Sequence, residues 1–219
     1  MFFKRKKDYS SLTRYDREKR SKCENYTLLN EKFVLKNQTI LLGDSITELF
    51  NWYELFYEFS KQSNQAVYNR GISGDTTDRL LERLDTNVLN ACPKNLVLLI
   101  GTNDIGRGLP LSISLKNVDG ILKKMKENLP EINIIFQAVY PINSSIRGKY
   151  EKRSARKINA MNREFIKLSE KYGCVWLDLT KELSDENGQL NHEYTYDGLH
   201  INVKAYEIIA GKVIPLLKK

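Results

Sequence analysis

Short apolar runs rich in β-branched residues recur along the chain, and each has the length of a β-strand. Five such runs occupy residues 39–42, 66–68, 96–100, 132–139 and 175–179. Apolar residues within them are nearly continuous instead of alternating with polar ones, which is typical of strands covered on both faces. The pattern therefore predicts a buried five-stranded sheet.

Longer stretches with apolar residues at helical spacing separate these runs. The clearest covers 111–129, which Pro130 ends, and another covers 154–172, which is followed by Gly173 at the position of a C-terminal cap. We also expect helices within 75–84, 203–217 and 8–37. Strands that alternate with helices of this length imply βαβ units, and therefore a parallel sheet in an α/β fold.

The chain is predicted to form one main domain. Its 219 residues, 41% hydrophobic and 28% charged, are typical of a soluble globular protein with a sizeable core. We assign residues 39–219 to that domain and residues 1–38 to a basic, helical extension that packs on it. No apolar run reaches the roughly 18 residues of a membrane-spanning helix, and segment 1–7 is not followed by the apolar core of a secretory signal.

The charge and the cysteine content limit which partners and which cellular setting we expect. We interpret the net charge of +8 as a solvated surface with a basic N-terminal arm, with contact to an anionic polymer or membrane surface as the alternative. No nucleic-acid-binding motif accompanies the charge, so we expect no nucleic-acid partner. The cysteines are three in number and widely spaced, which argues against a disulfide framework and a metal site. This usage predicts a reduced, cytoplasmic setting.

Polar or glycine-bearing segments follow four of the predicted strands. They cover residues 43–45, 69–71, 101–104 and 140–143. In a parallel α/β sheet the carboxyl ends of the strands lie on one rim, where the ligand crevice is found. We therefore expect these segments to meet at one site.

Ser45, Asp197 and His200 offer the parts that nucleophilic acyl transfer requires. Ser45 follows the first strand, where its hydroxyl can attack a carbonyl. The three-residue spacing lets the Asp197 carboxylate reach the Nδ1–H of His200, which leaves Nε2 to take the Ser45 proton. Each residue also has a structural interpretation: Ser45 and Asp197 as helix N-caps, and His200 as a surface side chain.

Gly71 and Asn103 are the predicted partners of the Ser45 N–H in an oxyanion hole. A glycine after a strand lets a backbone N–H approach a ligand closely, and an asparagine amide can donate to a developing negative oxygen. Both residue types are also common in turns. Asp44 and Asp104 flank these groups, and we expect them to orient the loops by hydrogen bonds to the backbone.

Four motifs resemble the sequence blocks of the SGNH, or GDSL, hydrolases, and they stand in the order of that family. They are GDSIT at 43–47, NRGISGDTT at 69–77, GTND at 101–104 and DGLH at 197–200. The second and third motifs are most similar to the branch that holds platelet-activating-factor acetylhydrolase catalytic subunits and bacterial sugar acetylesterases.

The resemblance implies a three-layer α/β/α sandwich with a flavodoxin-like, five-stranded parallel sheet. It also implies serine esterase chemistry without a metal or cofactor. By resemblance, Ser45 is the nucleophile of a triad with Asp197 and His200, and Gly71 and Asn103 belong to the oxyanion hole.

We accordingly predict a serine esterase for short-chain esters of small molecules, with acetyl esters of carbohydrates favoured. The alternatives are a lysophospholipase or thioesterase on the same site, and a catalytically silent binding module on the same fold. A nucleotide or flavin binder is a third class, which the missing glycine-rich phosphate fingerprint disfavours. The aromatic stretch 52–59 has three interpretations: a substrate pocket, a homodimer interface, or a helix face packed on the sheet.

Overall fold

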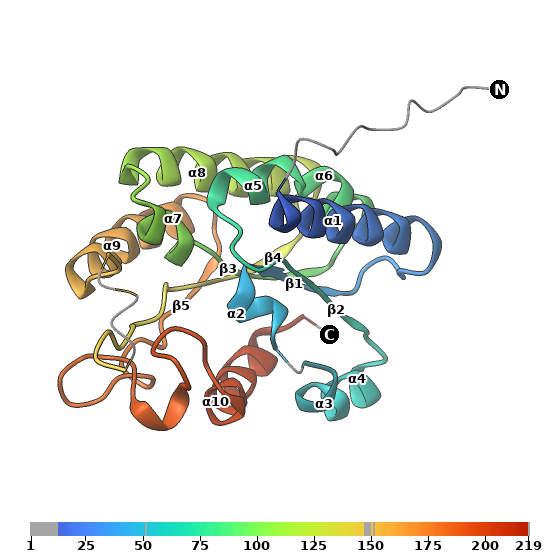
Figure 1. The fold of residues 1–219 in the computed structure, drawn as a ribbon. Helices are drawn as coiled ribbons and strands as arrows, with labels where there is room; N and C mark the ends of the chain where they lie inside the picture. Colours follow the sequence, from blue (N-terminus) through green and yellow to red (C-terminus); the bar gives the residue numbers. More distant parts are fainter. Residues whose placement is uncertain (1–12, 51, 147–149, 151, 219) are drawn as a thin grey trace.

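The computed structural model describes residues 13–50, 52–146, 150 and 152–218 of the protein. Five parallel strands form one sheet in the order β2-β1-β3-β4-β5 (Figure 1). Their bounds are β1 Thr39–Gly43, β2 Val67–Gly71, β3 Asn95–Leu99, β4 Asn133–Gln137 and β5 Val175–Leu177. The predicted parallel sheet is confirmed. The winding direction reverses between β1 and β3, and in open α/β sheets the ligand crevice lies at such a point.

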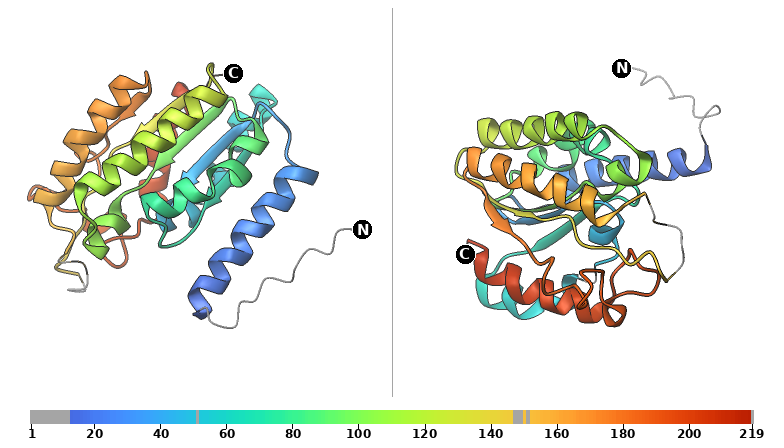
Figure 2. Two further views of the ribbon diagram at one scale, coloured as in Figure 1. Left: turned by 90° about the horizontal axis from the view of Figure 1, so that it is seen from above. Right: turned by 90° about the vertical axis from the view of Figure 1, so that its left-hand side faces the viewer.

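Helices cover both faces of the sheet (Figures 1 and 2). On one face lie α1 Arg14–Lys32, α5 Thr77–Glu82, α6 Leu84–Asn87, α8 Leu111–Asn128 and α9 Ala155–Lys171. On the other lie α3 Trp52–Leu55, α4 Tyr57–Ser63 and α10 Val203–Val213. The short helices α2 Ser45–Glu48 and α7 Thr102–Arg107 follow β1 and β3, and single 3₁₀ turns cover η1 Leu89–Ala91, η2 His192–Tyr194 and η3 Ile214–Leu216.

Side chains that alternate along a strand enter two different cores. Ile40 and Leu42 of β1 pack toward α5 and α8, whereas Leu41 between them packs with residues of α4 and α10. Because each face of the sheet has its own core, nearly every strand position is apolar. The α/β/α sandwich is therefore the architecture that the continuous apolar runs predict.

Two of the predicted strands extend further along the chain than the observed strands do. β4 ends at Gln137 and β5 at Leu177, although the apolar runs continue to Val139 and Leu179, which are each 1% exposed. The Val139 N–H donates to Asn162 Oδ1 of α9 at 2.8 Å instead of to a strand. The Ala138 N–H still donates to the Leu177 carbonyl of β5 at 2.9 Å, whereas Val139 and Leu179 are apolar because they are buried in the core.

The helix α1 covers the middle of the predicted N-terminal helical stretch, whose residues 8–12 lie outside the described part of the chain. It packs against α6, where Asn87 Nδ2 of α6 donates to the Cys23 carbonyl at 3.0 Å and Asn30 Nδ2 of α1 donates to the Thr86 carbonyl at 2.9 Å. The division at residue 38 stays a prediction. Within the described residues, none of the helices combines the length and apolar character needed to cross a membrane.

Candidate active site

The nucleophile candidate Ser45 lies at the point where β1 passes into α2. Asp44 is the N-cap of this helix, and its side chain accepts from the Ile46 N–H at 3.0 Å. Ser45 is therefore the first residue of α2, and it is 7% exposed. Ser45 is therefore a buried residue at a helix start, where the backbone N–H groups have no partner within the helix itself.

His200 joins Ser45 to Asp197 across 155 residues of sequence. Its Nε2 lies 3.0 Å from Ser45 Oγ, and its Nδ1 lies 2.8 Å from Asp197 Oδ2. The other carboxylate oxygen, Oδ1, accepts from the backbone N–H groups of Leu199 and His200 at 2.9 and 2.8 Å. The structure thus brings the three predicted residues into one hydrogen-bonded chain.

The surroundings of Asp197 keep it ionised. Partial burial acts to raise its pKa, but the hydrogen bonds from the His200 ring and from two backbone N–H groups outweigh burial and lower the pKa to about 2. An ionised carboxylate at this position fixes the Nδ1–H tautomer of His200 and stabilises its protonated ring.

Asn103 lies beside Asp44 but already has partners. Its Nδ2 donates to the Asp75 carbonyl at 3.0 Å and to Asp44 Oδ2 at 3.3 Å, and Arg153 Nη2 donates to its Oδ1 at 3.2 Å. Asp44 is fully buried, and this burial raises its pKa to about 7. The Asn103 amide therefore lies at the predicted rim of the sheet. Of the two hydrogen bonds that its Nδ2 donates, the one to Asp44 is the longer.

The contacts of Gly71 argue against its predicted place in the oxyanion hole. Its N–H donates to Asn69 Oδ1 at 2.8 Å, so this donor is already used inside the protein. A Cβ at this position would lie 2.3 Å from the Glu48 nitrogen. The lack of a side chain at Gly71 lets α2 pack closely on β2, which is a packing role.

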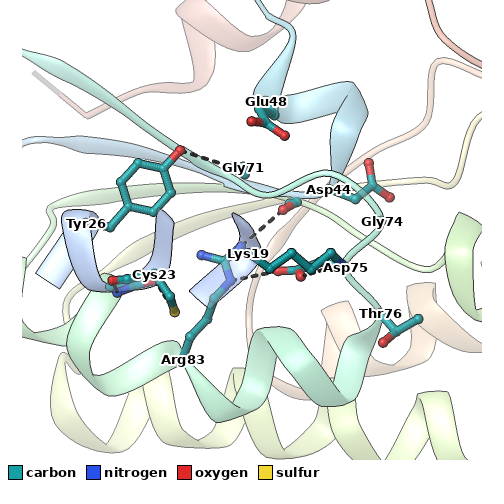
Figure 3. Close-up of polar contacts among 12 residues, drawn as sticks. Lys19, Cys23, Tyr26, Asp44, Glu48, Gly71, Gly74, Asp75, Thr76 and Arg83 are labelled. Atoms are coloured by element: carbon teal, nitrogen blue, oxygen red, sulfur yellow. Dashed lines mark hydrogen bonds and ion pairs between the residues drawn. The ribbon is translucent and has the colours of Figure 1, made fainter. Parts of the chain in front are cut away.

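Gly74 is a glycine that the sequence analysis missed. The Asp75 N–H donates to the Ile72 carbonyl at 3.1 Å, and Gly74 has φ of +70°, as expected for the third residue of a type II turn. Such a turn does not use the N–H of its third residue. Arg107 Nη2 holds the Gly74 carbonyl at 2.9 Å, and Figure 3 shows Gly74 next to Asp44. The sequence Ser73-Gly74-Asp75 is typical of a turn, and it is the feature of the sequence that could have pointed to Gly74.

Asp104 links three helices instead of facing the nucleophile. Its carboxylate accepts from the backbone N–H of Thr77 at 3.1 Å, at the start of α5, and from Ser114 Oγ of α8 at 2.9 Å. It is fully buried, and burial raises its pKa. These contacts hold α7, which carries Asn103, against its neighbours.

Tyr150 and Arg153, between β4 and α9, were not predicted at all. The Tyr150 hydroxyl donates to Asp197 Oδ2 at 3.0 Å, and the Arg153 guanidinium lies 5.4 Å from the centre of the Tyr150 ring. Arg153 also donates through Nε to the Thr102 carbonyl at 3.0 Å. The pair connects the Asp197 carboxylate with the amide of Asn103. No motif marks these residues in the sequence.

Comparisons with known proteins give a matching family model and solved structures with the same fold. The model of the GDSL-like Lipase/Acylhydrolase family matches residues 41–208. A solved structure from Streptococcus pneumonia, named as a suggested platelet activating factor, is 30% identical with a TM-score of 0.85, and the match covers 93% of this chain and 94% of that one. A GDSL-like lipase from Bacteroides thetaiotaomicron VPI-5482 shares the fold, at 24% identity and a TM-score of 0.74 over 88% of this chain and 97% of that one.

A curated relative is much longer. N-acylneuraminate cytidylyltransferase of Escherichia coli O18:K1:H7 is 23% identical over 214 residues, which make up 95% of this chain and 48% of that protein. The chain therefore spans about half the length of the curated relative that it matches.

Proposed function

Because this chain belongs to the GDSL-like lipase/acylhydrolase family of ester-hydrolysing serine hydrolases, we propose that it hydrolyses short-chain esters of small molecules with Ser45 as its nucleophile. The observation that carries the proposal is the chain of contacts from Ser45 Oγ to His200 Nε2 at 3.0 Å and from His200 Nδ1 to Asp197 at 2.8 Å. A hydroxyl, a base and an orienting carboxylate in this order match the roles of a serine hydrolase triad.

In the proposed acylation step, Ser45 Oγ bonds to the ester carbonyl carbon while its proton passes to His200 Nε2. The tetrahedral intermediate then collapses, the ester C–O bond breaks, and His200 gives the proton to the leaving alcohol. Water repeats both steps on the acyl-enzyme, with His200 again as base and then as acid. Asp197, kept ionised by its hydrogen bonds, stabilises the charged imidazole ring in both halves of the cycle.

We assign the oxyanion hole to the backbone N–H groups of Ser45 and Gly74 and to Asn103 Nδ2. Support comes from the helix start at Ser45 and from the turn at Gly74, whose N–H the turn itself does not use. Asn103 reaches an oxyanion by giving up its 3.3 Å bond to Asp44 while it keeps the bond to the Asp75 carbonyl. Preorganised donors of this kind act on the charge that develops in the transition state.

We place acetyl esters first among the candidate substrates, ahead of the long acyl chains of lysophospholipids or acyl thioesters. Support comes from the resemblance of the second and third motifs to platelet-activating-factor acetylhydrolase catalytic subunits and bacterial sugar acetylesterases.

Two observations favour a carbohydrate on the alcohol side. Tyr196 directly precedes Asp197 and is 73% exposed, so it presents an aromatic surface near the triad. The curated relative is named for N-acylneuraminate, an acidic sugar. We therefore place O-acetylated sugars first among the candidate substrates.

The test begins with Ser45→Ala and uses Ser112→Ala, an exposed serine of α8, as its control. A fluorophosphonate probe should label the unaltered protein and Ser112→Ala, and label Ser45→Ala not at all. Hydrolysis of p-nitrophenyl esters should fall as the acyl chain lengthens from acetyl to octanoyl, and acetylated sugars should be cleaved. Full turnover in purified Ser45→Ala would refute the mechanism, and a preference for long chains would favour the lysophospholipase or thioesterase alternative.

A further inference from the structure

The helix α1 lies outside the matched range 41–208, yet one of its faces touches the candidate active site. We propose that α1 is a positioning element for catalysis, in which Lys19 and Tyr26 hold the 71–75 segment that carries the Gly74 N–H. The inference rests on the proposed function. Lys19, Lys22 and Tyr26 follow one another at three- and four-residue spacing, so they share one face of the helix.

Tyr26 holds the end of β2. Its hydroxyl donates to the Gly71 carbonyl at 3.0 Å, three residues before Gly74 (Figure 3). The Arg70 guanidinium lies 4.8 Å from the centre of the Tyr26 ring and donates twice to Asn30 Oδ1 of α1, at 3.2 and 2.8 Å. Arg70 is only 3% exposed, so its guanidinium is not accessible to a substrate. It serves the contact with α1 instead.

Lys19 holds the other side of the turn. Its Nζ lies 3.4 Å from Asp75 Oδ1, and Arg83 Nε donates to Asp75 Oδ2 at 2.7 Å, so two cations share one carboxylate (Figure 3). Asp75 and Arg83 are buried, with side-chain exposures of 3% and 4%, and the Lys19 side chain is mostly covered at 11%. A buried ion of this kind keeps a defined position, because any displacement leaves charge without a partner.

The same network reaches the nucleophile. Arg83 Nη2 donates to the Gly43 carbonyl at 3.2 Å, two residues before Ser45. The Asp75 carbonyl accepts from Asn103 Nδ2, as described above. Asp75 is thus bound through its side chain to α1 and through its backbone to Asn103, with Gly74 as the preceding residue. A shift of Lys19 would move the donors on which the oxyanion depends.

A third contact ties α1 to the end of α2. Lys22 forms an ion pair with Glu48, and Glu48 Oε2 accepts from the Ser73 backbone N–H at 2.6 Å. Ser73 immediately precedes Gly74. The turn is therefore held from α1 at Gly71, at Ser73 through Glu48, and at Asp75.

Lys19→Met is the informative substitution, because it removes one cation and leaves Asp75 paired with Arg83. Lys19, Asp75 and Arg83 together carry a net charge of +1, and the pair of Asp75 and Arg83 that remains is neutral. We therefore expect the fold to be preserved while the turn loses its contact with Lys19. Tyr26→Phe removes a single hydroxyl and serves as a second variant that keeps the ring beneath Arg70. Lys19→Arg retains the charge, and Arg17→Met, an exposed cation of α1, is the matched control.

The experiment measures kcat and KM with p-nitrophenyl acetate, inhibition by phenylboronic acid, which forms a tetrahedral adduct on an active serine, and the Tm of each variant. We expect Lys19→Met to lower kcat and boronate affinity about tenfold, as small displacements of catalytic groups do. KM and Tm should stay near those of the unaltered protein. Tyr26→Phe should show a smaller loss, Lys19→Arg should restore kcat, and Arg17→Met should have no effect.

Two results would overturn the inference, and they are distinguishable. If the unaltered protein hydrolyses the ester while Lys19→Met and Tyr26→Phe match Arg17→Met in kcat, α1 has no positioning role. A kcat that falls only in proportion to the unfolded fraction leads to the same conclusion. If the unaltered protein neither hydrolyses esters nor reacts at Ser45, the proposed function fails and this inference fails with it.

Discussion

Arg153 donates a hydrogen bond to the Oδ1 of Asn103 at 3.2 Å, and this contact, together with the bond from Nδ2 to the Asp75 carbonyl at 3.0 Å, fixes which end of the amide faces Ser45. Arg153 offers only donors, so Oδ1 must turn toward it and Nδ2 must point away. Nδ2 then lies near Asp44 and the Asp75 carbonyl, next to the start of α2. A flipped amide would instead present its oxygen, an acceptor, to an oxyanion.

Replacing Arg153 should therefore impair the chemical step more than substrate binding. We expect Arg153→Met to lower kcat roughly tenfold, because the Asn103 amide loses the contact that orients it. KM should change little. The exposed Arg156 of α9, three residues further along the chain, provides the control Arg156→Met. An unchanged kcat in Arg153→Met, measured with p-nitrophenyl acetate, would mean that Asn103 is oriented without Arg153.

Asn103→Ala should have a larger effect than Arg153→Met, because it removes the donor itself. Loss of one oxyanion donor costs about 3 kcal/mol in the barrier, so kcat should fall by roughly two to three orders of magnitude. Fluorophosphonate labelling of Ser45 should become slower in the same variant. Asn159→Ala, an exposed position of α9, is the control. A decrease below about tenfold would remove Asn103 from the oxyanion hole.

Gly106 gives a test that separates activity from stability. Glycine inside a helix is about 1 kcal/mol less favourable than alanine, so Gly→Ala in α7 should stabilise the helix. At Gly106, however, a Cβ would lie 2.3 Å from Arg153 Cζ, so the guanidinium must move. We expect Gly106→Ala to lower kcat as Arg153→Met does, without a comparable fall in Tm.

Gly211→Ala in α10 is the matched control, because a Cβ there meets no heavy atom within 4 Å. It should raise Tm slightly and leave kcat unchanged. Equal kcat values for Gly106→Ala and Gly211→Ala would show that the position of Arg153 does not matter for turnover.

Asp44 makes stability depend on pH with a defined sign. Burial raises its pKa to about 7, above the usual value of 3.8 for an aspartate, so the folded state favours the protonated carboxyl. Its contribution to stability is full below pH 3.8 and is lost as the pH rises to about 7. Between pH 5 and pH 8 the loss amounts to about 2–3 kcal/mol.

Urea unfolding of the unaltered protein and of Asp44→Asn at both pH values measures this loss. The asparagine Oδ1 still accepts from the Ile46 N–H but does not titrate, so the difference between the two proteins isolates Asp44. Asp44→Asn should gain stability relative to the unaltered protein as the pH rises. Parallel pH profiles would mean that Asp44 keeps an ordinary pKa.

The sequence by itself predicted the five strands, the longer helices between them and the parallel sheet, and it identified Ser45, His200 and Asp197 as a candidate triad. Strand and helix periodicity is local, and Pro130 and Gly173 mark where two helices end. The rim that gathers Ser45 and Asn103 follows from topology alone, since the carboxyl ends of parallel strands meet on one edge. The family motifs cover the same residues and carry the triad assignment.

Only the tertiary structure decided which donors are available and what holds them. Gly71 and Gly74 both stand near the end of β2 in the sequence, but Asn69 occupies the N–H of one, and a positive φ places the other in a turn. The contacts of Arg153 with Asn103 and of Lys19 with Asp75 join residues 50 and 56 positions apart. No periodicity or motif encodes such pairs, because a hydrogen-bond partner depends on how distant elements pack and not on neighbours along the chain.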